Sequence, residues 1–543
     1  MEFINQNLLT ILILLPVVGA VLLLGHQMFW KQEGQLKWLA LGFTLLNFLV
    51  SLALFSGSAA AGSSGFSFEQ NVPWIRAINT NYHVGVDGLS FWLVILTTFI
   101  MPIAILSTWN AVEKRVTAFY VFLLLLESAM IGVFVSLDLL VFYLFFEASL
   151  VPMFFLIGIW GGENRIYAAV KFFIFTALGS LLMLVAIIGL FYIYADKTGL
   201  GGSFDFVAIL AAMQNGTLPL SSEAGMLLFL AFALAFAIKV PVFPFHTWLP
   251  DAHTEAPTAG SVILAAILLK MGTYGLMRFN FALFPDQSRE MAPLFIILAI
   301  IGIIYGALVA MVQPDVKRLV AYSSVAHMGF VILGMFSFTE MGMQGALFTM
   351  LAHGVTTGAL FLLVGFIYER RHTREITQFG GLANVMPVYA TIFVITTMAS
   401  VGLPFLNGFV GEFLIMVGMF QSHALAITAA VNWNYIAAML AGTGVIFAAV
   451  YLLWMVQRVF FGKVTNDKNR TLFDLTWREI GLMIPLLILM VYMGVFPKPF
   501  LNRSESAIKA IHERVMQQAG GTVDHAGIKP LAENEPVGDR DLE

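Results

Sequence analysis

Apolar residues fill long, nearly unbroken stretches of this chain, and short polar segments separate them. A helix that crosses a hydrocarbon core about 30 Å thick needs about 20 such residues. The pattern therefore predicts an all-α polytopic membrane protein with about 14 transmembrane helices. The predicted spans are residues 8–25, 36–56, 85–107, 115–136, 139–160, 167–194, 226–246, 257–279, 291–312, 317–337, 341–368, 386–419, 434–461 and 477–499.

The polar segments between these spans differ in character. Residues 57–84 and 195–225 are rich in Gly, Ser and Asn, and we expect surface connections there. The turn before the fifth helix is very short, and Ser136 and Asp138 are expected to cap that helix. After residue 500, SESAIKAIHERVMQQAGG predicts an amphipathic helix that Ser504 opens and Gly520 closes, and the polar sequence beyond it is expected to be loose.

Composition agrees with a membrane protein. The chain has 543 residues, of which 59% are hydrophobic and 11% are charged, whereas soluble domains carry about 25% charged residues. These values exclude a soluble enzyme and a nucleic-acid-binding protein. The absence of cysteine excludes thiolate metal sites, iron–sulfur clusters and disulfides within the chain. No basic residue precedes the first apolar segment, so we predict a retained first helix and not a cleavable signal peptide.

Lysine and arginine fall mainly in alternate connections, which indicates the orientation. Connections after even-numbered helices contain Arg76, Lys197, Arg278 and Arg289. Connections after odd-numbered helices contain Lys31, Lys37, Lys114, Arg115, Arg165, Lys317, Arg318, Arg370, Arg371, Arg374, Arg458, Lys463, Lys468, Arg470 and Arg478. The positive-inside rule then places the odd connections in the cytoplasm and both termini on the periplasmic side of a bacterial inner membrane.

Two predicted helices contain helix-breaking sequences. The seventh carries VPVFPF directly after Lys239, and the twelfth carries GLPFLNG just before Glu412. Proline removes a backbone donor and clashes with the preceding turn, so both helices are expected to break near mid-membrane. Paired interruptions in two halves are typical of inverted-repeat transporters, although prolines also kink membrane helices that transport nothing. The predicted divisions are 1–114 (three helices and an outer loop), 115–280 and 281–462 (five-helix repeats, helices 4–8 and 9–13), 463–500 (last helix) and 501–543 (outer tail).

Among the charged residues inside predicted spans, four stand out: Glu147, Lys239, Lys270 and Glu412. Each charge at membrane depth costs roughly 2.5–3.5 kcal/mol without a partner. One hypothesis is that they mark a route for protons or cations. The alternative is that they form static ion pairs that lock helices together.

Glu147 and Lys239 are predicted to lie at similar depth. A nearby carboxylate favours the ammonium form, so moving Glu147 away would let Lys239 release its proton. At about 4 Å and an effective dielectric constant near 20, the pair would be worth about 4 kcal/mol. His327 and His353 fall in the tenth and eleventh helices and suit a proton relay, because imidazole titrates near neutral pH. They are otherwise interpreted as hydrogen-bonded core histidines.

Other polar residues give weaker signals. His246 follows the first interruption, and we prefer it to His253 as a relay candidate. A metal site at these histidines is disfavoured because the spacing matches no standard ligand pattern. Lys171 is close to a loop and is expected to reach toward the membrane surface. Glu127 is interpreted as a polar contact between packed helices.

Several long motifs carry a resemblance to a known family. The stretches FFEASLVPMFFLIGIWGG, FAIKVPVFPFHTWLPDAHTEAPTAGSVILAAILLKMGTYGLMRF, DVKRLVAYSSVAHMGFV, LAHG and NGFVGEF resemble the antiporter-like membrane subunits of respiratory complex I, in particular those of the M type. The resemblance extends from the first helix to about residue 500. Glutamate at position 412, where the L and N types carry lysine, agrees with the M type, as does the lack of a long lateral helix.

The resemblance implies a function. It implies that Glu147 and Lys239 form the modulating pair, that Lys270 is the central station, and that His327 and His353 link it to Glu412. It also implies a proton-translocating subunit of NADH:quinone oxidoreductase, in contact with L-type and N-type chains and the lipid bilayer. NADH, FMN, iron–sulfur clusters and quinone are then expected in partner subunits, with no cofactor in this chain.

Two other functions stay open on the sequence. The first is an Mrp-type Na⁺/H⁺ antiporter subunit, which shares the fold and these charges. The second is a membrane scaffold with inert ion pairs.

Overall fold

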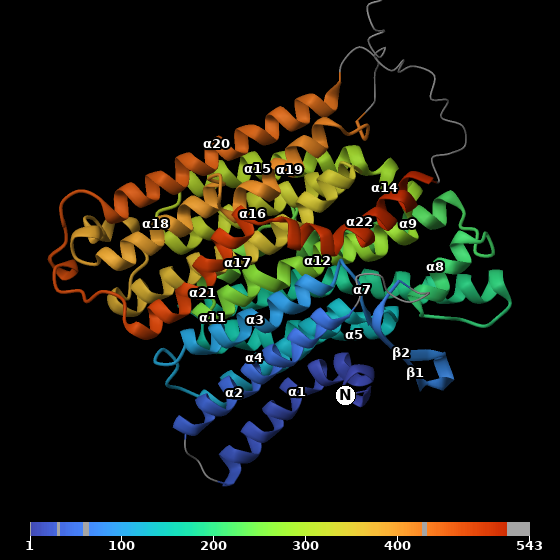
Figure 1. Ribbon diagram of the computed structural model, residues 1–543, viewed down its shortest axis with the longest axis horizontal. Coiled ribbons are helices and arrows are strands. Elements are labelled where there is room, and N and C mark those ends of the chain that lie inside the picture. Colours follow the sequence, from blue (N-terminus) through green and yellow to red (C-terminus); the bar gives the residue numbers. More distant parts are fainter. Residues whose placement is uncertain (1, 30–32, 58–64, 426–431, 518–543) are drawn as a thin grey trace, which may run out of the picture.

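The computed structural model describes residues 2–29, 33–57, 65–425 and 432–517, and most of them are helical. Twelve helices in these ranges are long and apolar enough to cross a membrane. Figure 1 shows helices running side by side, with α1 and α2 at one end of the molecule and α20 at the other. The prediction of an all-α polytopic membrane protein is confirmed.

Every predicted span corresponds to helical structure, although some spans are divided. The first helices are α1 (Glu2–Phe29), α2 (Glu33–Ser51) and α3 (Phe91–Ser107). The first predicted repeat contains α4 (Val116–Val135), α5 (Leu139–Ala148), α6 (Leu150–Trp160), α7 (Arg165–Thr198), α9 (Ser222–Lys239), α10 (Trp248–Glu255), α11 (Thr258–Ile263) and α12 (Leu269–Gly275), and α13 (Phe281–Leu283) follows at the start of the second. The second contains α14 (Pro285–Glu290), α15 (Ala292–Met311), α16 (Val316–Phe336), α17 (Glu340–Arg371), α18 (Pro387–Val401), α19 (Asn407–Phe420) and α20 (Trp433–Phe460). The last helices are α21 (Trp477–Val495) and α22 (Lys498–Gln517).

Helix α17 forms the centre of the second half. It packs against α16, α18, α19 and α21, and also against α11 of the first half. The 18-residue apolar window of α17 is fully buried, whereas α7 leaves much of its own window exposed to the membrane. Residues on α17 are therefore enclosed by protein on every side, which makes this helix a suitable carrier for polar groups at membrane depth.

Both predicted interruptions are present. Helix α9 ends at Lys239 and α10 begins at Trp248, with the proline-containing segment between them. Helix α18 ends at Val401 and α19 begins at Asn407. Trp248 Nε1 donates to the carbonyl of Ile238 at 2.9 Å and so satisfies one of the acceptors that the first break frees.

The eighth predicted span has an irregularity that the sequence did not predict. Two π-helical turns, η3 (Leu264–Leu268) and η4 (Leu276–Asn280), flank α12. A π turn widens a helix locally and is frequent at functional sites. The whole segment is buried, and α12 carries Lys270.

The outer connections contain more structure than expected. Strands β1 (Ser67–Ile75) and β2 (Thr80–Val86) form an antiparallel hairpin within the predicted loop 57–84 and the start of the third predicted span. The loop 195–225 contains α8 (Phe206–Gln214). The remaining short elements are the 3₁₀ turns η1 (Leu52–Ser56), η2 (Arg76–Ile78), η5 (Ile376–Gln378), η6 (Leu382–Asn384) and η7 (Asp467–Asn469).

Two capping predictions need correction. Asp138 does cap α5, because its carboxylate accepts from the backbone N–H groups of Leu140 and Val141. Ser136 does not; its hydroxyl donates back to Gly132. Ser504 lies inside α22, which begins at Lys498, so it does not open that helix. Gly520 and the polar tail after it lie outside the described residues.

Candidate functional site

The interruption of the seventh helix places Lys239 at the end of α9 and deep in the protein, where 1% of its surface is exposed. Its Nζ atom lies 4.9 Å from the ring centre of Phe146 and 5.9 Å from that of Phe172. Such cation–π contacts partly replace the water that a buried ammonium group loses. Among the described residues, Nζ has no hydrogen-bond partner.

Glu147, on α5, interacts with Lys239 electrostatically but does not form an ion pair with it. No contact of 4.0 Å or less joins the two charged groups, and Oε1 of Glu147 also has no hydrogen-bond partner in the described part of the chain. The sequence left this separation open, and the energy of about 4 kcal/mol at about 4 Å is therefore an upper figure for the pair. The two groups are close enough to influence each other, and either could move to form a direct pair.

Lys270 is fully buried on α12, and its partner is a histidine from the other half of the chain. Nζ of Lys270 donates to the carbonyl of Ala265 and lies 2.6 Å from Nδ1 of His353. The π-helical turn η3 includes Ala265, so the irregular helix supplies one of the lysine's acceptors. The family resemblance implied that His353 and His327 link Lys270 to Glu412, but no residue pattern indicated the contact itself, because 83 residues separate Lys270 from His353.

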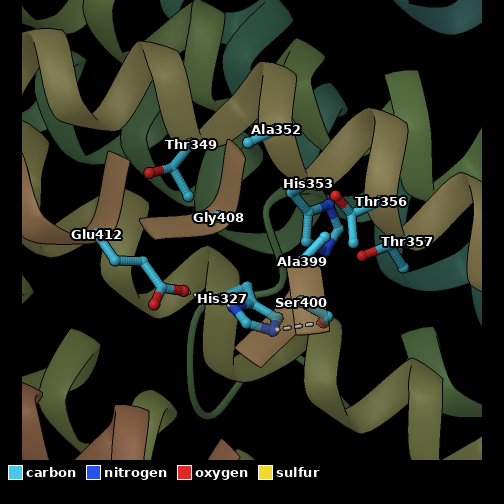
Figure 2. A pocket seen from close by; sticks show the side chains of 10 residues that line it. All are labelled: His327, Thr349, Ala352, His353, Thr356, Thr357, Ala399, Ser400, Gly408 and Glu412. Carbon is cyan, nitrogen blue, oxygen red and sulfur yellow. Dashed lines mark hydrogen bonds and ion pairs between the residues drawn. The ribbon is translucent and has the colours of Figure 1, made fainter. Parts of the chain in front are cut away.

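Further titratable groups lead from His353 toward the second interruption (Figure 2). The rings of His353 on α17 and His327 on α16 have centres 5.9 Å apart. Nδ1 of His327 lies 2.8 Å from Oε1 of Glu412 on α19, and Nε2 lies 3.4 Å from the hydroxyl of Ser400. Lys270, His353, His327 and Glu412 therefore form a continuous line of neighbouring titratable groups, which we call the central line.

A small cavity of about 20 Å³ lies beside the central line. A water molecule needs roughly 10–15 Å³ measured in this way, together with polar partners. Hydroxyl groups and imidazoles supply such partners, so the cavity has room for about one water. Its lining consists of His327, Thr349, Ala352, His353, Thr356, Thr357, Ala399, Ser400, Gly408 and Glu412 (Figure 2).

Asn407 is a site residue that the sequence interpretation missed. It is fully buried at the start of α19. Its amide donates to the carbonyl of Ala352 at 3.2 Å and accepts from the hydroxyl of Thr356 at 3.1 Å, so it joins the second interruption to the two sides of His353 on α17. A polar amide directly after the GLPFL break was the available signal.

The remaining candidates lie away from the central line. His246, between α9 and α10, stacks against Phe243 and meets the ring of Tyr305 edge-on. Lys171 forms an ion pair with Asp251 at 2.7 Å and does not simply reach outward.

Glu127 is the other buried carboxylate that the sequence raised. It is fully buried on α4, and its Oε1 atom accepts from the side chain of Asn47 at 2.8 Å. This is the polar contact between packed helices that the sequence suggested. Within the described ranges, no group of three or more His, Asp or Glu side chains is arranged to hold a metal ion.

The arrangement suits the movement of protons by its chemistry. Lysine, histidine and glutamate each exist with and without a proton, and neighbours in contact can exchange one through a hydrogen bond or a single water. These features define the class: a polytopic helical membrane protein with two interrupted helices and a buried line of titratable groups.

Comparison with known proteins identifies the family. Residues 136–441 match the family described as "NADH:quinone oxidoreductase/Mrp antiporter, TM". The chain is 47% identical over 501 residues to NADH-quinone oxidoreductase subunit M of Rhodobacter capsulatus, covering 91% of this chain and 94% of that relative. This chain therefore belongs to the NADH:quinone oxidoreductase/Mrp antiporter family of membrane subunits, and its likeness to subunit M extends over almost its full length.

Solved structures agree with this family assignment. A chain of respiratory complex I from Thermus thermophilus with bound NADH matches with a TM-score of 0.81 and 34% identity, covering 93% of this chain and 99% of that one. A chain of the archaeal membrane-bound sulfane sulfur reductase matches with a TM-score of 0.78 and 23% identity, covering 92% and 77%. The second likeness shows a shared fold.

Proposed function

We propose that this chain moves protons across a bacterial membrane as a subunit of NADH:quinone oxidoreductase. The observation that carries the proposal is the central line, in which Lys270, His353, His327 and Glu412 lie one after another in space inside the protein. Buried ionisable groups are costly unless they are paired or functional. A line of four that joins two predicted repeats supports transfer along it more than it supports static locking.

Transfer is proposed to begin at Lys239. Movement of α5 or α9 that brings Glu147 toward Lys239 favours the ammonium form, and movement apart favours release of the proton. The released proton passes to Lys270. The Lys270 ammonium then donates to Nδ1 of His353, and His327 carries the proton on to Glu412. No covalent bond other than those to the moving proton changes.

Electron transfer is proposed to take place in partner subunits that hold NADH, FMN, iron–sulfur clusters and quinone. This chain supplies proton transfer only and contacts other membrane subunits of the complex, including L-type and N-type chains. The distribution of lysine and arginine supports a periplasmic position for both termini. Full-length likeness to subunit M favours this assignment over an Mrp-type Na⁺/H⁺ antiporter, which the same family includes.

The test is Lys270→Ala in the assembled complex reconstituted in vesicles. Proton translocation per NADH oxidised is expected to fall to a small fraction of the wild-type value, because the central line loses its first member and the proton donor to His353. The matched control is Lys171→Ala, because Lys171 lies off the central line. Its ion-pair partner Asp251 still has a second cation, Arg318, 3.4 Å away in this variant. Unchanged proton translocation in Lys270→Ala would contradict the proposal. Translocation that requires sodium would favour the antiporter instead.

A further inference from the structure

A second cluster of titratable side chains lies on the face of the molecule that carries the β-hairpin. It consists of Glu69, His83, Asp138 and Asp205, and we call it the hairpin junction. These residues come from β1, β2, the turn before α5 and the turn before α8. None of them lies in a membrane-spanning helix. The proton-transfer mechanism does not use them.

Backbone hydrogen bonds join the segments of the hairpin junction directly. The N–H of Leu137 donates to the carbonyl of His83, and the N–H of Phe206 donates to the carbonyl of Leu137, both at 2.8 Å. The N–H of Leu139 donates to the backbone carbonyl of Phe204, also at 2.8 Å. The turn that opens α5 is therefore held between the hairpin and the start of α8.

His83 is at the centre of the hairpin junction and is 2% exposed. Its Nδ1 lies 2.8 Å from Oδ2 of Asp205, and its Nε2 lies 2.8 Å from Oε1 of Glu69. A neutral imidazole has one N–H donor, so one of these contacts would set a nitrogen lone pair against a carboxylate oxygen. The protonated ring donates to both. The geometry therefore fits a positively charged His83.

Asp138 is the third carboxylate of the hairpin junction and the N-cap of α5. Its Oδ1 accepts from Leu140 and Val141, and its Oδ2 accepts from the backbone N–H of Asn81 in β2 at 3.2 Å. It also pairs with Asp205 through a backbone bridge, so their negative charges interact. The positive charge of His83 offsets this accumulation of carboxylates.

The electrostatics agree with the geometry. Burial works against a charged His83, but hydrogen bonds and attraction from Asp205 and Glu69 more than offset it, and the pKa of His83 is raised. Burial, with a smaller contribution from the charge of Asp205, raises the pKa of Asp138 to about 6. The pKa of Asp205 is lowered, because contact with His83 and with backbone N–H groups outweighs its burial.

The hairpin junction is connected to the transport residues through α5. This helix runs from Leu139 to Ala148 and continues through Ser149, whose backbone is helical, into α6. Glu147 is nine residues after Asp138, which corresponds to about 13 Å along a helix axis. Because Glu147 lies on the helix that Asp138 caps, holding the N-terminus of that helix restricts where Glu147 can lie.

We propose that the hairpin junction positions Glu147 and responds to the proton concentration on its own face of the membrane. With His83 protonated, the junction holds the N-terminus of α5; with His83 neutral, the junction loosens and Glu147 is less firmly placed relative to Lys239. His83, Asp138 and Asp205 are thus positioning residues. The consequence for transport rests on the proposed function, whereas the loosening does not.

The direction of the pH response follows from these groups. The pKa of His83 is raised in the folded protein. The stabilisation that His83 gives the junction is therefore fully present below its unfolded pKa near 6.5, and it is lost as pH rises through the folded pKa. Asp138 acts in the same direction, because burial of its charged form, with a smaller contribution from repulsion by Asp205, costs free energy that protonation below about pH 6 removes. Asp205 stabilises the junction at pH values above its unfolded pKa near 3.9. The junction is expected to be firm near pH 6 and looser near pH 9.

Hydrogen–deuterium exchange of the intact complex tests the loosening. After correction for the intrinsic pH dependence of exchange, peptides covering residues 136–142 are expected to exchange at least several-fold faster at pH 9 than at pH 6. In His83→Gln, fast exchange is expected at both pH values. Asp205→Asn is expected to behave in the same way, because the amide still caps α8 but lacks the charge. A pH-independent wild type, or a His83→Gln that matches it, would overturn the proposal.

The matched control is His512→Gln. His512 lies on α22, 3.5 Å from Glu340, and takes no part in the hairpin junction. Exchange at residues 136–142 is expected to keep its wild-type pH dependence in this variant. Loss of that dependence would mean that any histidine change on the subunit disturbs α5, which also overturns the proposal.

A transport measurement tests the link to Glu147. In vesicles, with pH varied only on the hairpin face, protons translocated per NADH oxidised are expected to fall toward pH 9 in the wild type and to be low throughout in His83→Gln. An exchange response combined with a flat transport profile would overturn the positioning of Glu147. If the exchange response persists while Lys270→Ala translocates protons normally, the proposed function fails and the loosening of the hairpin junction stands.

Discussion

Each residue of the central line can be charged only when its neighbour accommodates that charge. Within the described part of the chain, the side chain of Lys270 has one side-chain hydrogen-bond partner, His353, and Glu412 contacts His327. In a low-dielectric interior, adding a proton to one member raises the free energy of a protonated neighbour. Contact between titratable groups therefore favours one excess proton at a time, which suits stepwise transfer.

The buried pair of Arg370 and Glu479 provides a residue-scale test of structural charges. Two hydrogen bonds of 2.7 and 2.6 Å join their side chains, which are 4% and 2% exposed. Arg370→Ala leaves Glu479 buried without its cation, and breaking such a pair costs about 3–5 kcal/mol. We expect a clearly lower midpoint in thermal unfolding of the purified complex.

Two controls accompany this prediction. Arg370→Lys keeps the charge but loses the bidentate geometry, so an intermediate midpoint is expected. Arg470→Ala breaks an exposed pair with Asp467, and exposed pairs contribute about 0–1 kcal/mol. An Arg370→Ala variant as stable as Arg470→Ala would show that the buried pair is not structural.

The sequence predicted the members of the central line but not their contacts. Charge inside apolar segments and the family resemblance were sufficient to select Lys270, His327, His353 and Glu412. Contacts between residues far apart in the chain depend on helix packing, which a single sequence does not report. The same limit explains why the separation of Glu147 and Lys239 stayed open, because depth in the membrane does not determine lateral distance.

At the scale of helices, hydropathy and proline were reliable guides. All predicted spans correspond to helices, and both interruptions fall where prolines remove backbone donors. The π-helical turns around Lys270 were missed because an entirely buried apolar segment has no polar periodicity to disturb. The hairpin was missed because SFEQNVPWI is short and follows a segment rich in Gly and Ser.

Close packing of α17 against α19 positions Glu412. A Cβ atom on Gly411 would lie 2.2 Å from the hydroxyl oxygen of Thr349 and 2.9 Å from its backbone nitrogen. Gly411→Ala is therefore expected to force α19 away from α17. Overpacking of this kind costs about 1–3 kcal/mol. Proton translocation should fall together with thermal stability, because Glu412 is the next residue.

Gly442→Ala is the matched control for Gly411→Ala. A Cβ atom there would meet only Met416, with its sulfur 3.8 Å away, which is an ordinary contact. This variant is expected to keep wild-type stability and translocation. Equal losses in both variants would show that α17–α19 packing does not position the site.

On the scale of the whole molecule, the two predicted repeats meet at the contact between Lys270 and His353. Lys270 belongs to the first predicted repeat and His353 to the second, so a proton that follows the central line must pass between them. Residues that act as one unit give non-additive effects. The double variant Lys270→Ala/His353→Ala should therefore translocate about as few protons as the worse single variant.

Proton translocation and NADH oxidation, measured in parallel in the two single variants and the double variant, check this expectation. Two strictly multiplicative losses would indicate that Lys270 and His353 act on separate routes. Assembly of the complex must be equal in all three variants, which native gel electrophoresis establishes.

The cavity beside His327 and Glu412 also bears on selectivity. A space of about 20 Å³ has room for one water molecule and no more. An alkali cation travels either with its hydration shell or in a cage of oxygen ligands that replaces that shell. A hydrated cation does not fit in this space, so sodium or potassium would have to exchange its water for the hydroxyl and carboxylate oxygens that line the cavity. A proton needs only to be handed from one heavy atom to the next, so the small cavity disfavours hydrated alkali cations and leaves proton transfer unaffected.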